Sequence, residues 1–370
     1  MASNQAPKTA ALLLGNRTEG YAGSRRDEQI ESTAIGIAAA MFKRRPELLS
    51  LLLGTLPCHQ SCLLPIGWLD QCRHWRDLVY LCRDLSQDSV SGVTGSPLVF
   101  AVLAKNTEAF TILLDRGYEP DWRTWKAIGY WNATAMTSIL RHRDLKFTVD
   151  GSRNCHLEAC VTLNAAIRLH SNVELVRLLL DVGLPVNCDT RSFWVQRTPL
   201  QTAVEQGNIL ILRILLEAGA KVNAPPCRDK GASALQLAAI KGYLGIVKLL
   251  LEPERSVIAS LPVRLSLPVL IIRNRWAKEC DESKAFLVVE KANMNCPRGR
   301  SCGRTALEGA AEYGRINMIK LLLEHGANIS GTGRRQFVRS IKFAERNGHF
   351  MAAGLLRRRR EWMEEDERLA

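Results

Sequence analysis

The densest group of possible metal ligands in the sequence is Cys58-His59-x2-Cys62-x9-Cys72-x-His74. Zinc modules hold the ion with four thiolate or imidazole ligands, which they present as short Cys-Cys and His-His pairs. The spacing here matches such pairs only loosely, and Cys72 falls at a helical interval among Trp, Leu and Val residues. We therefore interpret these cysteines as buried thiols, and we predict neither a metal site nor a cofactor.

Nucleophilic catalysis needs Ser, Cys or Thr beside a histidine that an acidic residue orients. All seven histidines fall at expected helix ends or loops, and the sequence contains no GxSxG, P-loop or GxGxxG stretch between a strand and a helix. Glu364, Glu365 and Asp366 are predicted to lie in an exposed charged tail. We therefore predict no catalytic residues and expect that the chain is not an enzyme.

The composition favours packed helices. The 370 residues are 46% hydrophobic but only 6% aromatic, and Leu, Ala, Ile and Val dominate, which suits short helices better than a β-sandwich. The run ALLLG near the start is too short for a signal peptide, and no apolar run approaches the roughly 18 residues of a membrane span. We expect a protein of the cytosol or nucleus without membrane contact, with its eleven cysteines as small buried thiols.

The net charge of +13 is concentrated near the C-terminus, where residues 331–360 hold nine Lys or Arg and one Glu. Such a zone attracts nucleic acid or acidic proteins, so one hypothesis is a chromatin-associated regulator that uses the stretches GRRQFVRSIK and RRRR. The alternative is a solvated helix face with Arg357–Glu361 and Arg360–Glu364 pairs. The sequence favours the second interpretation.

A sequence motif of about 20 residues recurs along the chain. Residues 233–252, SALQLAAIKGYLGIVKLLLE, are echoed by residues 305–324, TALEGAAEYGRINMIKLLLE. Further copies start at Ser96, Thr162 and Thr198, the second with a slip of one residue, and another fits if it starts at Arg339. The starts define a period of about 34 residues, with two gaps of about twice that length, and such a period indicates a repeat array.

Each part of the repeat has a physical role. Thr198, Ser233 and Thr305 can cap a first helix by accepting a backbone N–H bond. Alanines follow that allow close packing, and a glycine such as Gly207 then ends the helix in a left-handed conformation. A second apolar helix and a short hairpin complete the unit. Because helices this short are marginal alone, neighbouring repeats must bury each other's faces.

This pattern resembles the ankyrin repeat family. The residues that carry the resemblance are Thr198-Pro199-Leu200, Ala203, Gly207 and the stretch LLEAGA with Asn223, and residues 305–328 repeat them. The loop sequences are similar to those of the large group of fungal ankyrin proteins. The resemblance implies an all-α, right-handed solenoid of about nine or ten helical pairs. This sequence departs from the family at the fourth residue of the motif. Where the family usually has histidine, this chain has Val99, Gln201, Gln236 or Glu308.

The expected organisation runs from a disordered segment (1–27) through degenerate helical capping units (28–92) to ankyrin repeats (93–252). An irregular segment (253–296) follows, then further repeats (297–356) and a charged C-terminal helix or tail (357–370). For residues 253–296 two alternatives remain open: a degenerate repeat with an extended loop, or a segment that is not native coding sequence. Detection of tryptic peptides between Arg255 and Lys278 in native extract would exclude the second alternative.

The resemblance implies a protein-binding scaffold that captures partners on its concave face and at its hairpin tips. The tips here are residues 188–197, 224–232 and 296–304, and arginine on all three suggests an acidic surface on the partner. Aromatic and arginine side chains are the usual binding anchors. The predicted partner-binding residues are Arg191, Phe193, Trp194, Arg197, Arg228, Lys230, Arg300 and Arg304. The alternative for Phe193 and Trp194 is that they pack beneath their own loop.

Asn223 and Asn328 occupy the hairpin position that asparaginyl hydroxylases modify in some ankyrin repeats. We predict instead that they are turn residues that tolerate a left-handed conformation.

Overall fold

The computed structural model describes residues 36–38, 40–42, 44–53, 62–65, 92–147, 153–188, 197–225, 231–251, 291–299 and 303–368. The chain divides into two compact units. The N-terminal unit comprises Met1–Ala166 with Val182–Leu184, and the C-terminal unit comprises Ile167–Asp181 with Pro185–Ala370.

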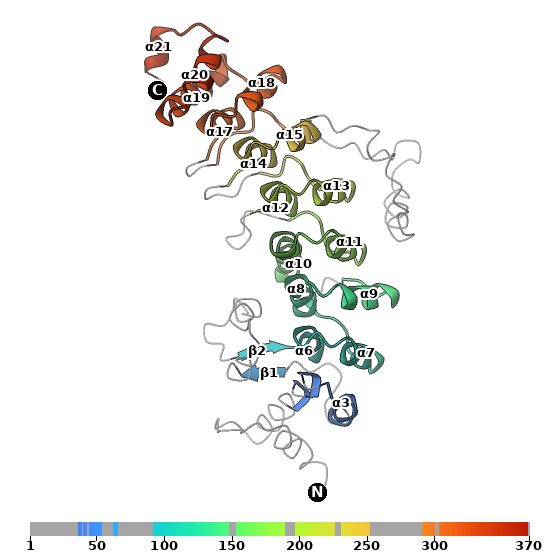
Figure 1. Ribbon diagram of the computed structural model, residues 1–370. Coiled ribbons are helices and arrows are strands. Elements are labelled where there is room, and N and C mark those ends of the chain that lie inside the picture. Colours follow the sequence, from blue (N-terminus) through green and yellow to red (C-terminus); the bar gives the residue numbers. More distant parts are fainter. Residues whose placement is uncertain are drawn as a thin grey trace, which may run out of the picture. The chain divides into compact units, whose positions relative to one another are not determined.

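The N-terminal unit consists of two layers of short helices. The helices are α3 (Pro46–Leu53), α6 (Pro97–Leu103), α7 (Thr107–Asp115), α8 (Trp122–Trp131), α9 (Thr134–His142) and α10 (Arg153–Ala165). One layer stacks α6, α8 and α10, and the other stacks α3, α7 and α9 (Figure 1). Phe100, Phe110 and Trp125 are almost fully buried in its core. The predicted helical pairs that start near Ser96 and after Asp121 are confirmed.

The N-terminal unit also contains one feature that we did not predict. Strands β1 (Cys62–Pro65) and β2 (Gly92–Gly95) pair in antiparallel register, with Cys62 opposite Gly95. The second strand has the sequence GVTG, in which glycine and β-branched residues disfavour a helix. The fold is all-α as predicted, with this two-stranded sheet added where the expected capping units meet the first ankyrin repeats.

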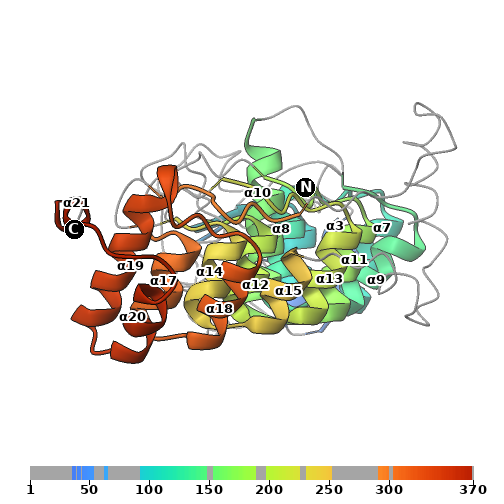
Figure 2. The ribbon, with the colours of Figure 1, turned by 90° about the horizontal axis from the view of Figure 1, so that it is seen from above.

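The C-terminal unit repeats the helix–turn–helix plan. Its elements are α11 (Val173–Asp181), α12 (Pro199–Gln206), α13 (Ile209–Glu217), α14 (Ala234–Lys241), α15 (Leu244–Leu251), α17 (Ala306–Glu312), α18 (Ile316–Glu324), the 3-10 turn η3 (Gly331–Gly333), α19 (Arg334–Arg346), α20 (Phe350–Arg357) and α21 (Glu364–Glu367). The first helices of the pairs, α12, α14, α17 and α19, stack in one row. The second helices form the other row, where α11 contacts α13 and α18 contacts α20 (Figure 1, Figure 2).

Two repeat starts differ from the prediction. Helix α19 begins at Arg334, five residues before the expected start at Arg339, and it follows η3 without a side-chain cap. The predicted start of the repeat at Thr162 lies inside α10, which continues into a π-helical turn, η2 (Ala166–His170). A π turn accommodates one additional residue in a helix. It therefore explains the one-residue slip of this copy.

The predicted helix caps are confirmed at the best-preserved repeats. Thr198, Ser233 and Thr305 each accept a bond from the backbone N–H three residues later. Gly207 ends α12 with φ 71°. A Cβ atom at this glycine would lie 2.9 Å from Cζ of Tyr243 in the next repeat. Both the backbone conformation and the neighbouring ring therefore require glycine here.

The cysteines differ in part from the prediction of free thiols. Cys160 is part of a disulfide, and so is Cys188. Cys296 is a free thiol, and burial raises its pKa despite a hydrogen bond with Ser233 that lowers it.

Residues 291–296 complete the repeat that α14 and α15 begin. In neighbouring repeats a backbone N–H closes the second helix by bonding to the carbonyl five residues earlier, as Ala220 does to Leu215 and Ala327 to Leu322. Ala292 makes the same bond to Leu250 over 3.0 Å, although it lies 42 residues further along the chain. The additional 37 residues are thus inserted within one repeat. Residues 291–296 thus close a repeat, whereas residues 252–290 lie outside the described part, so both alternatives for the segment 253–296 stay predictions.

Deletion of residues 253–289 together with Lys291→Gly should leave a cooperative fold. The junction then reads LLEEGAN, which matches LLEAGAK of the repeat at 215–221. Because a repeat tolerates a long insertion at little cost and also its removal, we expect the melting temperature to stay within about 3 °C of the parent's. Circular dichroism measures this transition.

The matched control is the same deletion with Lys291 retained. Lys291 then occupies the position of Gly219, whose φ is 85°, and we expect this strain to cost about 1 kcal/mol relative to the glycine variant. Loss of cooperative melting in the glycine variant would show that the inserted segment is part of the folded core.

Candidate functional site

Most of the predicted partner-binding residues lie outside the described part of the chain. These are Arg191, Phe193, Trp194, Arg228, Lys230 and Arg300. The side chains of the cysteine–histidine group at residues 58–74 also lie outside it. Within the described residues, no group of His, Cys, Asp or Glu side chains could hold a metal ion. Nor is any helix there long and apolar enough to cross a membrane.

Arg197 and Arg304 are described, and both form two-pronged ion pairs within their own repeat. Arg197 donates to Glu205 through Nε over 2.8 Å and through Nη2 over 3.0 Å. Arg304 donates to Glu312 over 2.7 and 3.0 Å. About a quarter of each arginine side chain is exposed. These pairs brace the first helices α12 and α17, and a partner-binding role for the two arginines stays a prediction.

The sequence contained a signal for these pairs. In both repeats arginine precedes the capping threonine, and glutamate follows eight residues after the arginine. In the repeat between them the two positions hold Ala232 and Ile240. An arginine of this kind has an internal partner, and its charge is already balanced.

The fourth motif residue connects each repeat to the next. Gln201 and Gln236 complete capping boxes with Thr198 and Ser233, and both glutamines are 1% exposed. The amide of Gln201 donates to the Ala224 carbonyl over 3.1 Å. That of Gln236 donates to the carbonyls of Cys296 over 2.9 Å and Pro297 over 3.1 Å. The glutamines therefore tie each first helix to the hairpin that follows its repeat.

Glu308 connects its repeat to the next one through an ion pair. It completes a capping box with Thr305, but a carboxylate has no N–H to give to a carbonyl. Instead it pairs with Arg339 on α19 over 3.1 Å while being only 2% exposed. At Val99 the box is missing, and Ser96 makes no side-chain cap bond.

A ladder of asparagines joins successive hairpins. Asn187 donates to the Gly219 carbonyl and accepts from the N–H of Lys221. Asn223 makes the same two bonds to Lys291 and Asn293, and Asn295 makes them to Gly326 and Asn328. Within the described backbone, neither Asn223 nor Asn328 has a positive φ. Asn223 lies in a turn as predicted, but neither asparagine adopts the left-handed conformation; the Asn223 side chain joins two hairpins, and Asn328 takes part in the ladder through its backbone N–H.

Comparison with known protein families agrees with this geometry. The family model described as ankyrin repeats in three copies matches residues 163–259, and the single ankyrin repeat model matches residues 302–333. The chain contains ankyrin repeats. The first matched stretch extends past the end of α15 at Leu251 into the insertion, and the second begins after it.

Curated relatives share these repeats. A putative ankyrin repeat protein of fowlpox virus is 31% identical over 147 residues, which are 38% of this chain and 32% of the relative. The ankyrin repeat and SOCS box protein 3 of Bos taurus is 32% identical over 174 residues (47% and 31%). The B-cell lymphoma 3 protein homolog of Mus musculus is 30% identical over 137 residues (37% and 30%). The chain spans about a third of the length of these relatives, and their sources give no support to a fungal type.

The ankyrin array ends in an ion cluster. Asp366 on α21 is fully buried and accepts hydrogen bonds from Arg334 over 2.7 Å, from the N–H of Met363 over 2.9 Å and from Arg360. Burial alone would raise the pKa of Asp366, but these bonds outweigh burial and hold the pKa well below its usual range. Glu365 also pairs with Arg334, over 2.6 Å.

The cluster corrects two predictions. Asp366 does not lie in an exposed tail, because the segment folds back onto α19. The predicted pairs Arg357–Glu361 and Arg360–Glu364 are wrong: Arg357 pairs with Glu345 over 2.7 Å, and Arg360 pairs with Asp366. Helix α20 ends at Arg357, so the helical spacing that those pairs require does not extend into the tail.

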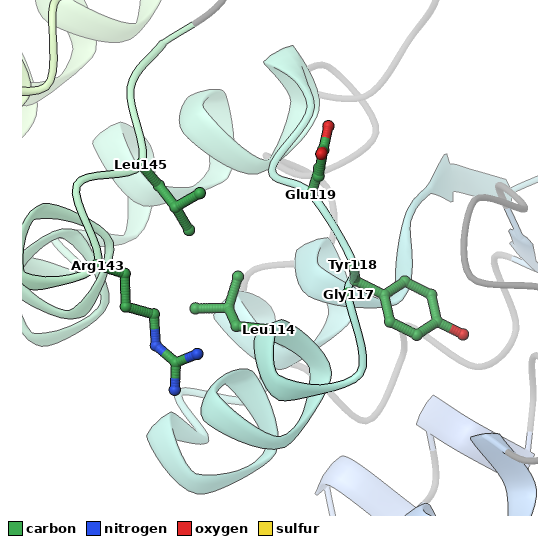
Figure 3. Close-up of a pocket in the computed structure, with 6 residues that line it drawn as sticks. All are labelled: Leu114, Gly117, Tyr118, Glu119, Arg143 and Leu145. Carbon is green, nitrogen blue, oxygen red and sulfur yellow. The ribbon is translucent and has the colours of Figure 1, made fainter.

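The N-terminal unit carries a pocket of about 400 Å³ at the ends of α7 and α9 (Figure 3). Its lining residues are Leu114, Gly117, Tyr118, Glu119, Arg143 and Leu145. Arg143 pairs with Asp115 over 2.7 Å. The pocket combines two leucines with the carboxylate of Glu119 and the guanidinium of Arg143, and among the described residues it holds no cluster of side chains that could bind a metal ion.

Replacement of Gln236 by Glu should destabilise the array. The new carboxylate would face the carbonyl oxygens of Cys296 and Pro297 without a proton to donate, which should cost about 1–3 kcal/mol. Urea unfolding followed by circular dichroism measures the change. Gln206→Glu, on the exposed end of α12, is the matched control and should be nearly neutral. Equal stability of the two variants would contradict the proposed link.

Replacement of Asp366 by Asn should lower the urea midpoint at neutral pH. Because the pKa of Asp366 is depressed, its stabilising effect is present above the ordinary carboxyl pKa of about 4 and is lost as the pH falls below that value. The difference between parent and variant should therefore shrink in acid. Glu364→Gln removes an exposed charge from the same turn and should have little effect. A pH-independent difference would count against the ion cluster.

Proposed function

We propose that this chain is a non-catalytic scaffold that binds partner proteins through the first-helix side of its repeats and the adjoining hairpin tips. The observation that carries the proposal is the linked array of α12, α14, α17 and α19. Its inter-repeat bonds hold successive hairpins at fixed spacing, and rigid spacing lowers the entropic cost of binding. Such an arrangement presents a surface rather than an enclosed reaction site.

The binding residues that we propose are those of the three tips. Residues 188–197, 224–232 and 296–304 contain Phe193, Trp194, Lys230 and several arginines. Aromatic and arginine side chains supply most of the binding energy at protein interfaces, and the excess of arginine favours a partner with an acidic surface. We place this function in the cytosol or nucleus. That the chain is a fungal-type ankyrin protein, as its loop sequences suggest, is likewise a proposal only.

The alternative is a chromatin-associated regulator that contacts nucleic acid through its basic C-terminal region. Arg358 and Arg359 are exposed and could contribute. Arg334, Arg357 and Arg360 are already paired with carboxylates, which reduces the charge available to phosphates. Absence of retention on heparin at low salt would remove this alternative.

Replacement of Trp194 and Arg228 by Ala should abolish capture of partner proteins by the tagged chain. Arg197 is left intact because its ion pair with Glu205 supports α12. The double variant should melt as the parent does, since both residues are expected at hairpin tips. Quantitative affinity purification from native extract measures the capture.

The matched control replaces Lys248 and Lys320 by Ala on the second helices α15 and α18, where both side chains are exposed. This variant should capture partners as the parent does. If the tip variant kept its partners while the control lost them, the binding surface would lie on the second-helix side instead.

A further inference from the structure

Four arginines gather where α17 and α19 pack together in the C-terminal unit. Arg304 and Arg339 are each paired with a glutamate of α17. Arg298, in the hairpin before α17, and Arg335, in the first turn of α19, are exposed, and neither has an ion-pair partner among the described residues. The two glutamates balance two of the four positive charges, so the cluster keeps an excess of two.

An aromatic ring supports two of these arginines. The guanidinium carbon of Arg304 lies 4.2 Å from the ring centre of Phe343 on α19, and that of Arg339 lies 5.3 Å from it. Cation–π contact and the ion pairs together fix these side chains. Arg304 and Arg339 are therefore held in place before any partner arrives, so these two side chains lose little conformational entropy on binding.

The four charges act on one another. Burial lowers the pKa of Arg339, the charge of Glu308 raises it, and the like charges of Arg298, Arg304 and Arg335 lower it further. Glu308 only partly relieves this repulsion. An added anion near Arg298 and Arg335 would relieve more of it.

The same helix already binds an acidic segment of its own chain. Arg334, the neighbour of Arg335, holds Asp366 and Glu365 of the C-terminal turn, and Arg360 completes that site. Carboxylates spaced along a peptide thus fit the guanidinium groups at this end of α19. Arg298 and Arg335 offer the equivalent groups without a carboxylate in place.

We propose that Arg298 and Arg335, supported by Arg304, Arg339 and Phe343, bind a carboxylate-rich segment of a partner protein. This surface deepens the scaffold function proposed above and rests on it. Glu308 and Glu312 favour a peptide over nucleic acid, because fixed carboxylates between the arginines would repel the continuous charge of a phosphate backbone. A peptide can place its carboxylates on Arg298 and Arg335 and neutral residues over the glutamates.

The test uses the full chain and, as the probe, a fluorescein-labelled peptide in which glutamates alternate with neutral residues. Replacing Arg298 and Arg335 by Glu should weaken peptide binding by about tenfold or more, measured by fluorescence polarisation. The matched control replaces Arg358 and Arg359 by Glu. It makes the same change in net charge on exposed residues after α20, and it should change the affinity less than about twofold. Melting curves verify that both variants fold.

Equal weakening in both variants would overturn the proposal, since it would show attraction to net charge alone. Preference for a single-stranded oligonucleotide of matched charge, lost in the Arg298 and Arg335 variant, would overturn it in favour of nucleic acid. The scaffold function fails separately: it is contradicted if the parent chain captures no specific partner, whereas undiminished capture by the Arg298 and Arg335 variant contradicts only this surface.

Discussion

The structure depends on one constraint: helices of seven to nine residues, such as α12, α13 and α17, cannot be stable alone. Each must bury its apolar face against the next repeat, and its buried polar groups must find partners there. The side chains that connect repeats meet this need in three ways. Glutamine amides donate to the next hairpin, Glu308 pairs with Arg339, and asparagines join hairpin to hairpin.

These connections explain how the repeat that contains α14 and α15 accepts an insertion. The insertion falls between the end of α15 and Lys291, and the bonds that join this repeat to its neighbours are made by described residues on either side of it. Asn223 bonds to Lys291 and Asn293 as Asn187 does to Gly219 and Lys221. What matters to the array is the position of the closing hairpin, not the length of chain that leads to it.

The sequence predicted the features that are determined locally. Thr198 and Gly207 were recognisable because a helix cap and a left-handed glycine depend on a few adjacent residues. The partner of Glu308 was not, because Arg339 lies 31 residues away and its pairing depends on how two repeats pack. The tail was mispredicted for a similar reason: helical spacing suggested local pairs, whereas Asp366 binds Arg334 across a fold of the chain. For the hairpin tips the sequence supplied the residue types alone, so their role remains a proposal.

The described arginines of the repeats thus differ in role: some brace their own helix, as Arg197 does, and others, such as Arg298, have no ion-pair partner among the described residues. Inter-repeat bonding determines the fold on both sides of the insertion. Hydrogen exchange of the intact chain tests this claim most directly. The amides of Ala292 and Asn293 should be protected as strongly as those of Ala220 and Lys221; exchange at the rate of an unfolded peptide at Ala292 and Asn293 alone would contradict it.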